Sequence, residues 1–446
     1  MRRGAGGRRY LLDIAAYGLV GCALLFSAYC VLRVNWSIEG SANGGTVARK
    51  LVTTGSGGNV KVLEKQAGVT SPLQAGAVIG IEGQQAKEKP CPEIHAVAPR
   101  IMSAAVSVRN PRKYHLVTTA QGFSNAWQAR IHYYWYKKQR EICEEAGVCD
   151  MGGFTRLLHS GEADDLMDEI PTVVVDPLPK EIMLDNSYVV LNRPWAFLEW
   201  LKKVSIPEKY MIMGEGDHLW MRPMPNMMVG EGVGAALFSY MTPDKYGDIV
   251  RKFIGQVSDE EVKKVPQIGN SPTMMAVKDF RRMAPIWYNV TMEIFNDKEA
   301  HEAWSWVLEM YGFTIATHKA GLYGFTIATY KAGLHEGLTA YSNMLAHPPF
   351  DSKQVDYKGD PFYLLHLTYP MRFNKTGGMT DKADETAWMF DKRSYMDKPP
   401  PRNLAMPPAN VDNELARLTI SMFNEATDTI PCWDVYVRDK VITSKC

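Results

Sequence analysis

An excess of charge of one sign is missing from this chain. Its 446 residues include 50 Lys and Arg residues against 49 Asp and Glu residues, which gives a formal net charge of +1 at pH 7. Proteins that bind nucleic acid through electrostatics usually carry a clear basic excess on one face. The composition therefore argues against a nucleic-acid partner, and the length allows one large domain or two ordinary ones.

Dense clusters of metal-binding side chains are also missing from the sequence. The spacings of the seven cysteines do not resemble a zinc site, and the His and Asp residues are too scattered for a two-metal phosphohydrolase. Cys143 and Cys149 are close enough to form a short disulfide loop. Three other cysteines lie outside the apolar N-terminal segment, and this odd number predicts a free thiol or an intermolecular bond. They are Cys91, Cys432 and Cys446.

The N-terminal region is strongly patterned. Residues 1–13 carry four arginines, and residues 14–32 contain no charged side chain. About 20 apolar residues are needed to span a bilayer, so residues 14–34 are predicted to form an uncleaved transmembrane signal anchor. The arginines before it place residues 1–13 in the cytosol as a short tail. Residues 35–94 have no aromatic side chain after Trp36 and are predicted to form a flexible stem.

The remaining residues, 95–446, are therefore expected to form a lumenal domain of a single-pass type II membrane protein. Sequons begin at Asn35, Asn289 and Asn374, and they would be glycosylated only on the lumenal side.

Strand-like and helix-like patterns alternate from about residue 113 onward. Strands are predicted at 113–120, 170–179, 210–217 and 234–241. Residues 188–204 are predicted to turn from a short strand into a helix. Further helices are predicted at 124–147, 244–254 and around 297–311, and residues 268–272 (IGNSP) are predicted to form a turn. This alternation predicts an α/β sheet whose ligands bind at the carboxyl ends of its strands.

A twelve-residue repeat interrupts the pattern. YGFTIATHKAGL (311–322) is followed directly by YGFTIATYKAGL (323–334). Twelve residues turn an ideal helix through about 1200°, so a continuous helix through both copies would misplace its apolar face. A helix that ends at Gly321, with the second copy outside it, is the more economical prediction. We interpret the repeat as a recent duplication or an error in the gene model rather than a functional array.

The strand predicted at 210–217 ends in Glu215-Gly216-Asp217-His218. An acid-x-acid at the end of a strand supplies carboxylates for a divalent cation, and glycine between them allows a tight turn. An exposed turn without metal is the competing interpretation. Asp217 is predicted to be the main ligand, Glu215 to bind through water or to hold a ribose, and His218 to pack. His366, in the apolar run FYLLHLTYP, is either a core residue or a distant third ligand.

Several longer strings carry a resemblance to a known family. WQARIHYYWYKK, GGFTRLLHSG, YVVLNRPWAFLEWL, GNSP, DKRSYMDKPPPRNLAMPP and NEAT occur in this order between about residues 110 and 435. In order and spacing they resemble the plant and green-algal hydroxyproline O-arabinosyltransferases. The family's acidic motif matches residues 215–218, where the family has proline at the position of Gly216. Its His-x-Thr-Tyr segment matches His366 to Tyr369, which implies that His366 is the third metal ligand.

The resemblance implies a pentosyltransferase of the Golgi membrane, with cis-Golgi or endoplasmic reticulum as alternatives. It implies a GT-A-like α/β domain with a mixed, mostly parallel sheet flanked by helices. The expected reaction moves L-arabinofuranose from UDP-arabinofuranose to hydroxyproline of secreted and cell-wall proteins or peptides, with retention of configuration. Mn²⁺ is the expected cofactor, with Mg²⁺ as the alternative, and an oligomer with itself or with other Golgi enzymes is a further expectation.

Other site residues are predictions on matched strings. Candidates for binding the donor UDP-sugar are Thr118, Thr119, Gln128, Arg156, His159 and Arg193. A hydroxyproline-rich acceptor favours polyproline II, which docks onto aromatic side chains. The candidate acceptor platforms are Tyr133, Tyr134, Trp135 and Trp433. The weakest assignments are Asp391 and Glu425, which are candidates for a catalytic carboxylate.

Two alternative functions remain open at this stage. A peptidyl-serine galactosyltransferase of the same glycoprotein pathway would share the acid-x-acid chemistry. A catalytically silent Golgi binding protein would account for the duplication and for glycine at position 216, although the retained acids and His366 argue against it.

Overall fold

The computed structural model describes residues 110–119, 121–182, 188–228, 232–322, 338–443 and 445–446. The expected tail, membrane anchor and stem, the second repeat copy, Asn35 and Cys91 all lie outside these residues. Within the described residues, no helix combines the length and the apolar character needed to cross a bilayer.

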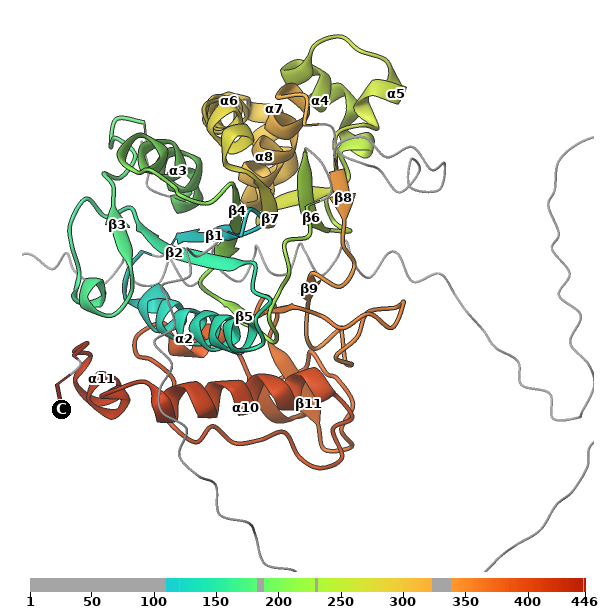
Figure 1. The fold of residues 1–446 in the computed structure, drawn as a ribbon. Helices are drawn as coiled ribbons and strands as arrows, with labels where there is room; N and C mark the ends of the chain where they lie inside the picture. Colours follow the sequence, from blue (N-terminus) through green and yellow to red (C-terminus); the bar gives the residue numbers. More distant parts are fainter. Residues whose placement is uncertain (1–109, 120, 183–187, 229–231, 323–337, 444) are drawn as a thin grey trace, which may run out of the picture. The chain divides into compact units, whose positions relative to one another are not determined.

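A seven-stranded sheet forms the centre of the described domain (Figure 1). Its spatial order is β3-β2-β1-β4-β7-β6-β8. The strands are β1 (Tyr114–Thr119), β2 (Met151–Leu158), β3 (Thr172–Val174), β4 (Tyr210–Glu215), β6 (Val233–Leu237), β7 (Ile268–Ala276) and β8 (Leu338–Ala340). Strands β3, β2, β1 and β4 run parallel, β7 runs antiparallel to β4 and β6, and β8 is parallel to β6. The predicted mixed, mostly parallel sheet is confirmed.

Two smaller sheets follow the central one. One has the order β5-β10-β9, with β5 (His218–Trp220), β9 (Leu345–Ala346) and β10 (Leu364–His366). The other is a hairpin of β11 (Met371–Asn374) and β12 (Thr386–Phe390).

Helices cover both faces of the central sheet (Figure 1). Along each strand the apolar side chains alternate between two cores: Leu116 and Ile212 face one core, whereas Val117, Met211 and Met213 face the other. The second core is closed by α3 (Asn192–Lys203), α6 (Val277–Asn296) and α8 (Leu308–Lys319). The first is closed by α2 (Phe123–Glu145), with α10 (Glu414–Thr429) and α11 (Trp433–Asp439) packed beyond it.

The remaining helices are short. They are η1 (Asp165–Asp168), η2 (Val189–Leu191), η3 (Pro243–Tyr246), α4 (Gly247–Ile254), α5 (Asp259–Val262), α7 (Lys298–Trp304), η4 (Ser305–Val307) and η5 (Lys392–Tyr395).

Two local predictions are wrong. Residues 189–191 form the 3₁₀ helix η2 instead of a strand and lead directly into α3. Residues 268–272 belong to β7, a strand buried along its whole length, instead of a turn. The glycine there serves packing, since a Cβ at Gly269 would lie 2.5 Å from the Met310 Cε. The Phe238 ring lies 3.1 Å from the same Cβ position, so a larger residue at Gly269 would require its neighbours to move.

Other boundaries differ less from expectation. The strand expected at 170–179 shrinks to the half-buried edge strand β3. The helical stretch around 297–311 is broken between α7 and α8 by Ser305, which has a φ of 41°. Helix α8 ends at Lys319 and is followed by Gly321 with a φ of 64°, as predicted for the first repeat copy.

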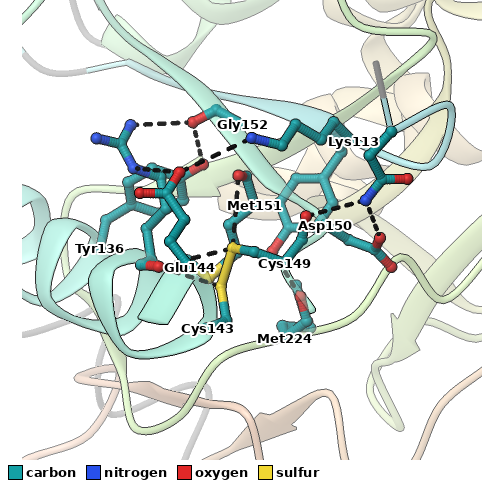
Figure 2. The surroundings of a disulfide bond; sticks show 12 residues. Lys113, Tyr136, Cys143, Glu144, Cys149, Asp150, Met151, Gly152 and Met224 are labelled. Carbon is teal, nitrogen blue, oxygen red and sulfur yellow. Dashed lines mark hydrogen bonds and ion pairs between the residues drawn. A yellow bond between two sulfur atoms is a disulfide. The ribbon is translucent and has the colours of Figure 1, made fainter. Parts of the chain in front are cut away.

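A disulfide joins the end of α2 to the region before β2 (Figure 2). Cys143 and Cys149 have their Cα atoms 4.8 Å apart, which confirms the predicted loop. The hydroxyl of Tyr136 and the guanidinium of Arg140 each donate to the Gly152 carbonyl at 3.2 Å, and they join the same helix to β2. A second disulfide joins the last cysteine to the start of α11. It links Cys432 and Cys446.

Candidate metal and donor site

The acid-x-acid motif lies where the chain leaves the central sheet. Strand β4 ends at Glu215, a turn follows, and β5 begins at His218 in the smaller sheet. Strand β10 pairs antiparallel with β5 and places His366 opposite His218. The two imidazole centroids are 4.7 Å apart, and His366 Nε2 lies 3.3 Å from Asp217 Oδ2. Residues almost 150 positions apart in sequence therefore meet at one point.

Asp217 is the charged centre of this group. Its side chain is 4% exposed, and the ammonium of Lys392, at the start of η5, contacts Oδ2. Burial by itself would raise the pKa of this carboxyl, but Lys392 and His366 hold it well below its ordinary value. Asp217 is therefore an ionised acceptor in a buried position.

Three imidazoles near Asp217 have pKa values below the ordinary value, and burial is the main cause in each. Burial, with the neighbouring His366, lowers the pKa of His218 well below its ordinary value and that of His347 to about 3. Burial also lowers the pKa of His132 to about 4, and this residue contacts the His218 carbonyl oxygen through Nδ1 at 2.7 Å. Neutral imidazole is the form that binds metal ions.

The donor set fits a divalent cation. One ligand atom each from Asp217, His218 and His366 lies within 4.8 Å of the others. His218 Nε2 and His366 Nδ1 are buried and have no hydrogen-bond partner, as expected for groups that complete their bonding with a ligand. One carboxylate with imidazoles suits Mn²⁺ better than Mg²⁺, which prefers an all-oxygen shell. His218 was expected only to pack, yet it lies within the group.

Glu215 does not join this group. Its Oε1 lies 3.3 Å from the guanidinium of Arg193, on α3. Arg193 also pairs with Glu309 Oε2 at 3.0 Å and reaches Asn270 Oδ1 at 3.4 Å. Burial raises the pKa of the Glu309 carboxyl to about 7, although Arg193 opposes the rise. The two acids of the motif thus serve two neighbouring polar clusters.

The predicted donor residues divide into two groups. Thr119 pairs in register with Glu215, and Gln128 lies beside Gly216, so both border the end of β4. His159 follows β2, and burial together with the Arg193 charge lowers its pKa to about 4. Together with Arg193 these residues collect at the carboxyl ends of the parallel strands.

The other two predicted donor residues lie inside the sheet. Thr118 is fully buried, and its hydroxyl has no hydrogen-bond partner among the described residues. The buried guanidinium of Arg156 pairs with Asp164 and donates to the Thr172 hydroxyl at 2.9 Å. Arg156 therefore stabilises the edge of the sheet beside β3.

The predicted acceptor platforms are mostly interior residues. Trp433 and Trp135 are buried, and their indole N–H groups donate to carbonyl oxygens of the chain. Tyr133 and Tyr134 are half-buried on α2, and the Tyr134 hydroxyl donates to Glu425 at 2.8 Å. The contacts of Trp135 and Tyr134 join α2 to α10, so packing accounts for the positions of these two residues. The Trp433 indole donates to the Pro400 carbonyl, and the Tyr133 ring packs against Phe154.

The two weak catalytic candidates are engaged elsewhere. Asp391 caps η5 by accepting from the Arg393 amide at 3.0 Å. Glu425 accepts from Tyr134 and pairs with Lys138. Of the sequon residues, Asn289 is exposed on α6, and Asn374 is half-buried at the end of β11.

Sequence reasoning missed three residues of this region. Lys392 carries no local signal, because its role depends on η5 reaching Asp217 across the fold. His347 follows β9 and lies with its ring 5.4 Å from that of His366. Glu309 had a usable signal, because it is the lone acid of α8, Leu308–Lys319, in a stretch that is otherwise mostly uncharged.

Comparisons with known proteins agree on one family. The model described as the hydroxyproline O-arabinosyltransferase family N-terminal domain matches residues 114–327, and the C-terminal domain of the same family matches residues 363–434. A hydroxyproline O-arabinosyltransferase of Medicago truncatula is 44% identical over 323 residues, which cover 72% of this chain and 82% of that protein. Hydroxyproline O-arabinosyltransferase 3 of Arabidopsis thaliana is 43% identical over 327 residues, covering 73% and 83%.

More distant matches are also glycosyltransferases. A peptidyl serine alpha-galactosyltransferase of Arabidopsis thaliana is 23% identical over 186 residues, which cover 38% of this chain and 22% of that protein. Among solved structures, apo mouse xyloside xylosyltransferase 1 covers 57% of this chain and 97% of its own, with 10% identity. Its TM-score of 0.31 is too low to support an argument.

Proposed function

This chain belongs to the hydroxyproline O-arabinosyltransferase family, and we propose that it transfers L-arabinofuranose from a UDP-linked donor to the hydroxyl of hydroxyproline. The acceptors would be secreted or cell-wall proteins and peptides. The proposal includes a GT-A-like arrangement of the domain and retention of the anomeric configuration.

One structural observation supports the proposal independently of family membership. Asp217, His218 and His366 meet at the carboxyl end of β4, beside the ends of β1 and β2. Parallel strands bring their ligand-binding residues to this edge, so a nucleotide-sugar and a cation would share it. The ionised Asp217 and the buried His218, whose pKa is lowered, give the edge the electrostatics that a cation requires.

We assign the cation to Asp217 and His366, with His218 as the neighbouring third group. When bound, the ion would neutralise charge on the departing diphosphate. Lys392 supplies a second positive charge next to Asp217, and Arg193 supplies a third next to Glu215. Thr119, through its place beside Glu215, and His159 lie where the uridine and sugar would enter.

The proposed location is the Golgi lumen, with residues 14–34 as the anchor. The two disulfides support an oxidising compartment, because such bonds persist outside the cytosol. Exposed Asn289 and the sequon at Asn374 also fit the lumenal side. Loss of mobility shift after Asn289→Gln and Asn374→Gln in the secretory pathway would test this part separately.

The deciding experiment is a transfer assay with a hydroxyproline-rich peptide and either UDP-arabinofuranose or UDP-galactose. We expect arabinose transfer that requires Mn²⁺ and is abolished by a chelator, and an anomeric linkage that retains the donor configuration by NMR. A parallel assay with a serine-containing peptide tests the galactosyltransferase alternative. The distant match to a peptidyl serine alpha-galactosyltransferase of Arabidopsis thaliana motivates this alternative.

Three outcomes would contradict the proposal in different ways. Galactose transfer to serine alone would replace the arabinosyltransferase with the alternative enzyme. Transfer that persists in the presence of the chelator would show that the reaction does not need a cation at this site. Binding of hydroxyproline peptides without transfer to any acceptor would identify a silent binding protein.

A further inference from the structure

Two short series of aromatic rings converge on His347, next to the candidate cation site. One series runs from Tyr240 to Phe238, with centroids 5.5 Å apart, and on to His347 at 5.9 Å. The other runs from Phe350 to Tyr369, with centroids 4.9 Å apart, and on to His347 at 6.4 Å. The inner end of both series is therefore the same imidazole.

His347 connects these rings to the candidate metal ligands. Its ring lies 5.4 Å from the ring of His366, whose Nε2 is 3.3 Å from Asp217 Oδ2. The loop after β9 that carries His347 continues to Phe350, and β10 with its following residues carries both His366 and Tyr369. Two ring contacts therefore separate Tyr369 from His366.

The outer rings are exposed, although large aromatic side chains normally bury their surface. The exposed fractions are 55% for Phe350, 46% for Tyr240 and 37% for Tyr369. We name these three residues the aromatic rim. Phe238 beneath Tyr240 is buried, so the rim rests on a packed base rather than on a free loop. Exposed aromatic residues grouped beside a polar site are typical of binding surfaces.

The chemistry of the rim fits an uncharged, proline-like chain. The faces of Phe350 and Tyr369 are almost perpendicular, at 87°, and therefore offer two differently oriented surfaces for pyrrolidine rings. A polyproline II segment has no internal hydrogen bonds, so its carbonyl oxygens are available to donors such as tyrosine hydroxyls.

We propose that the aromatic rim of Tyr240, Phe350 and Tyr369 binds the acceptor polypeptide in polyproline II conformation and presents one hydroxyproline to the site at Asp217 and His366. This inference rests on the proposed function and specifies its acceptor surface. It places the acceptor on residues after β6 and around β9 and β10, instead of on Tyr133, Tyr134, Trp135 and Trp433.

The test compares acceptor and donor kinetics of rim variants in the full chain. The double variant Phe350→Ala and Tyr369→Ala should raise the KM for a hydroxyproline-rich peptide by about tenfold or more, as expected for loss of central aromatic contacts. The KM for UDP-arabinofuranose and the slow hydrolysis of the donor in water should stay within about twofold, because neither requires the acceptor.

Tyr357→Ala is the matched control. Tyr357 is 83% exposed and lies outside the rim, so its removal should leave the acceptor KM unchanged. Tyr134→Ala tests the alternative surface on α2. If the double variant fails to fold, as judged by circular dichroism, Phe350→Leu and Tyr369→Phe retain bulk and should give smaller changes in the same direction.

The inference and the proposed function fail in distinguishable ways. A wild-type chain that transfers no arabinose to any hydroxyproline peptide would overturn both. A wild-type chain that transfers arabinose, with rim variants of unchanged acceptor KM, would overturn the rim alone. An increase of the acceptor KM in Tyr134→Ala, without an increase in the rim variants, would show that the acceptor binds on α2 instead of on the rim.

Discussion

Glu215 and Asp217 are two residues apart, but their surroundings differ in almost every respect. Glu215 is the last residue of β4, its side chain is 28% exposed, and it pairs with Arg193. Asp217 lies past the turn, its side chain is 4% exposed, and it contacts His366 and Lys392. The turn between them leads from the central sheet to the smaller one. Each acid therefore contacts a different group of partners.

This difference shows that the two acids of an acid-x-acid motif can have entirely separate partners. Asp217 acquires its role from His366, which arrives through the pairing of β5 with β10. Glu215 acquires a different role from Arg193 and the buried Glu309 behind it. Four substitutions test how far these roles are separate, and they follow in order of decreasing expected effect.

Asp217→Asn should have the largest effect. The change removes the ionised acceptor of the cluster, and we expect transfer to fall by about 100- to 1000-fold, the usual consequence of losing one preorganised charge in an active site. Glu215→Gln is the matched control, expected to lower transfer by about tenfold or less because Glu215 pairs with Arg193 instead. Equal losses for both, measured as kcat/KM for the donor, would show that the two acids act together.

Glu309 should make stability depend on pH. Its folded-state pKa of about 7 lies above the ordinary value of 4.5, so the folded chain holds this proton to a higher pH than the unfolded chain. Its contribution to the free energy of unfolding is present below about pH 4.5 and is lost as pH rises through about 7, by an amount on the order of 3 kcal/mol. Urea unfolding of wild type and Glu309→Gln at several pH values measures this.

The expected result for Glu309→Gln is a flatter dependence of unfolding free energy on pH between about 4.5 and 7. Glu425→Gln is a suitable control, because Glu425 is half-buried on α10 and pairs with Lys138. Identical slopes in wild type and Glu309→Gln would contradict the assignment of the raised pKa to this carboxyl.

Lys392→Gln should strengthen cation binding modestly. The Lys392 ammonium contacts the same Asp217 oxygen that a cation would use, so an ion entering the site must displace it. Removing this competitor should lower the Kd for Mn²⁺, measured by calorimetry without donor, by up to about fivefold, or ~1 kcal/mol. Lys398→Gln, exposed in the same segment, should leave the Kd unchanged. Weaker binding in Lys392→Gln would mean that the lysine supports the cation.

Gly216→Ala should have the smallest effect. Gly216 is not among the described glycines with positive φ, and an added Cβ would meet Ala129 N at 3.7 Å and Gln128 Cβ at 3.8 Å, which are ordinary contacts. The backbone at position 216 therefore gives no support to the prediction that the turn requires glycine. Alanine should stabilise the chain by about 0.4–1 kcal/mol by restricting the unfolded state, as measured by urea unfolding. A clear destabilisation would show that the turn needs glycine.

Local pattern predicted much of the fold but not the interior of the sheet. The strand at Tyr114–Thr119, helix α2 and the strand ending at Glu215 follow their apolar periodicity closely. The sequence pattern did not predict strand β7, because Gly269, Asn270 and Ser271 favour turns. Tertiary packing overrides this propensity. In the candidate site, the motif singled out Asp217 and the family resemblance singled out His366, and the structure brings the two together, whereas Lys392 carries no local signal.

The sequence by itself determined the alternation of strands and helices, the acid-x-acid at the end of β4 and the Cys143–Cys149 loop, because each depends on residues close together in the chain. Only the tertiary structure decided that Asp217 and Glu215 have different partners, and that the ring contacts of Tyr240, Phe350 and Tyr369 lead to His347, next to His366. These outcomes depend on the pairing of β5 with β10 and on the segments that follow. Such long-range contacts are selected by the packing of the whole domain, which no local pattern encodes.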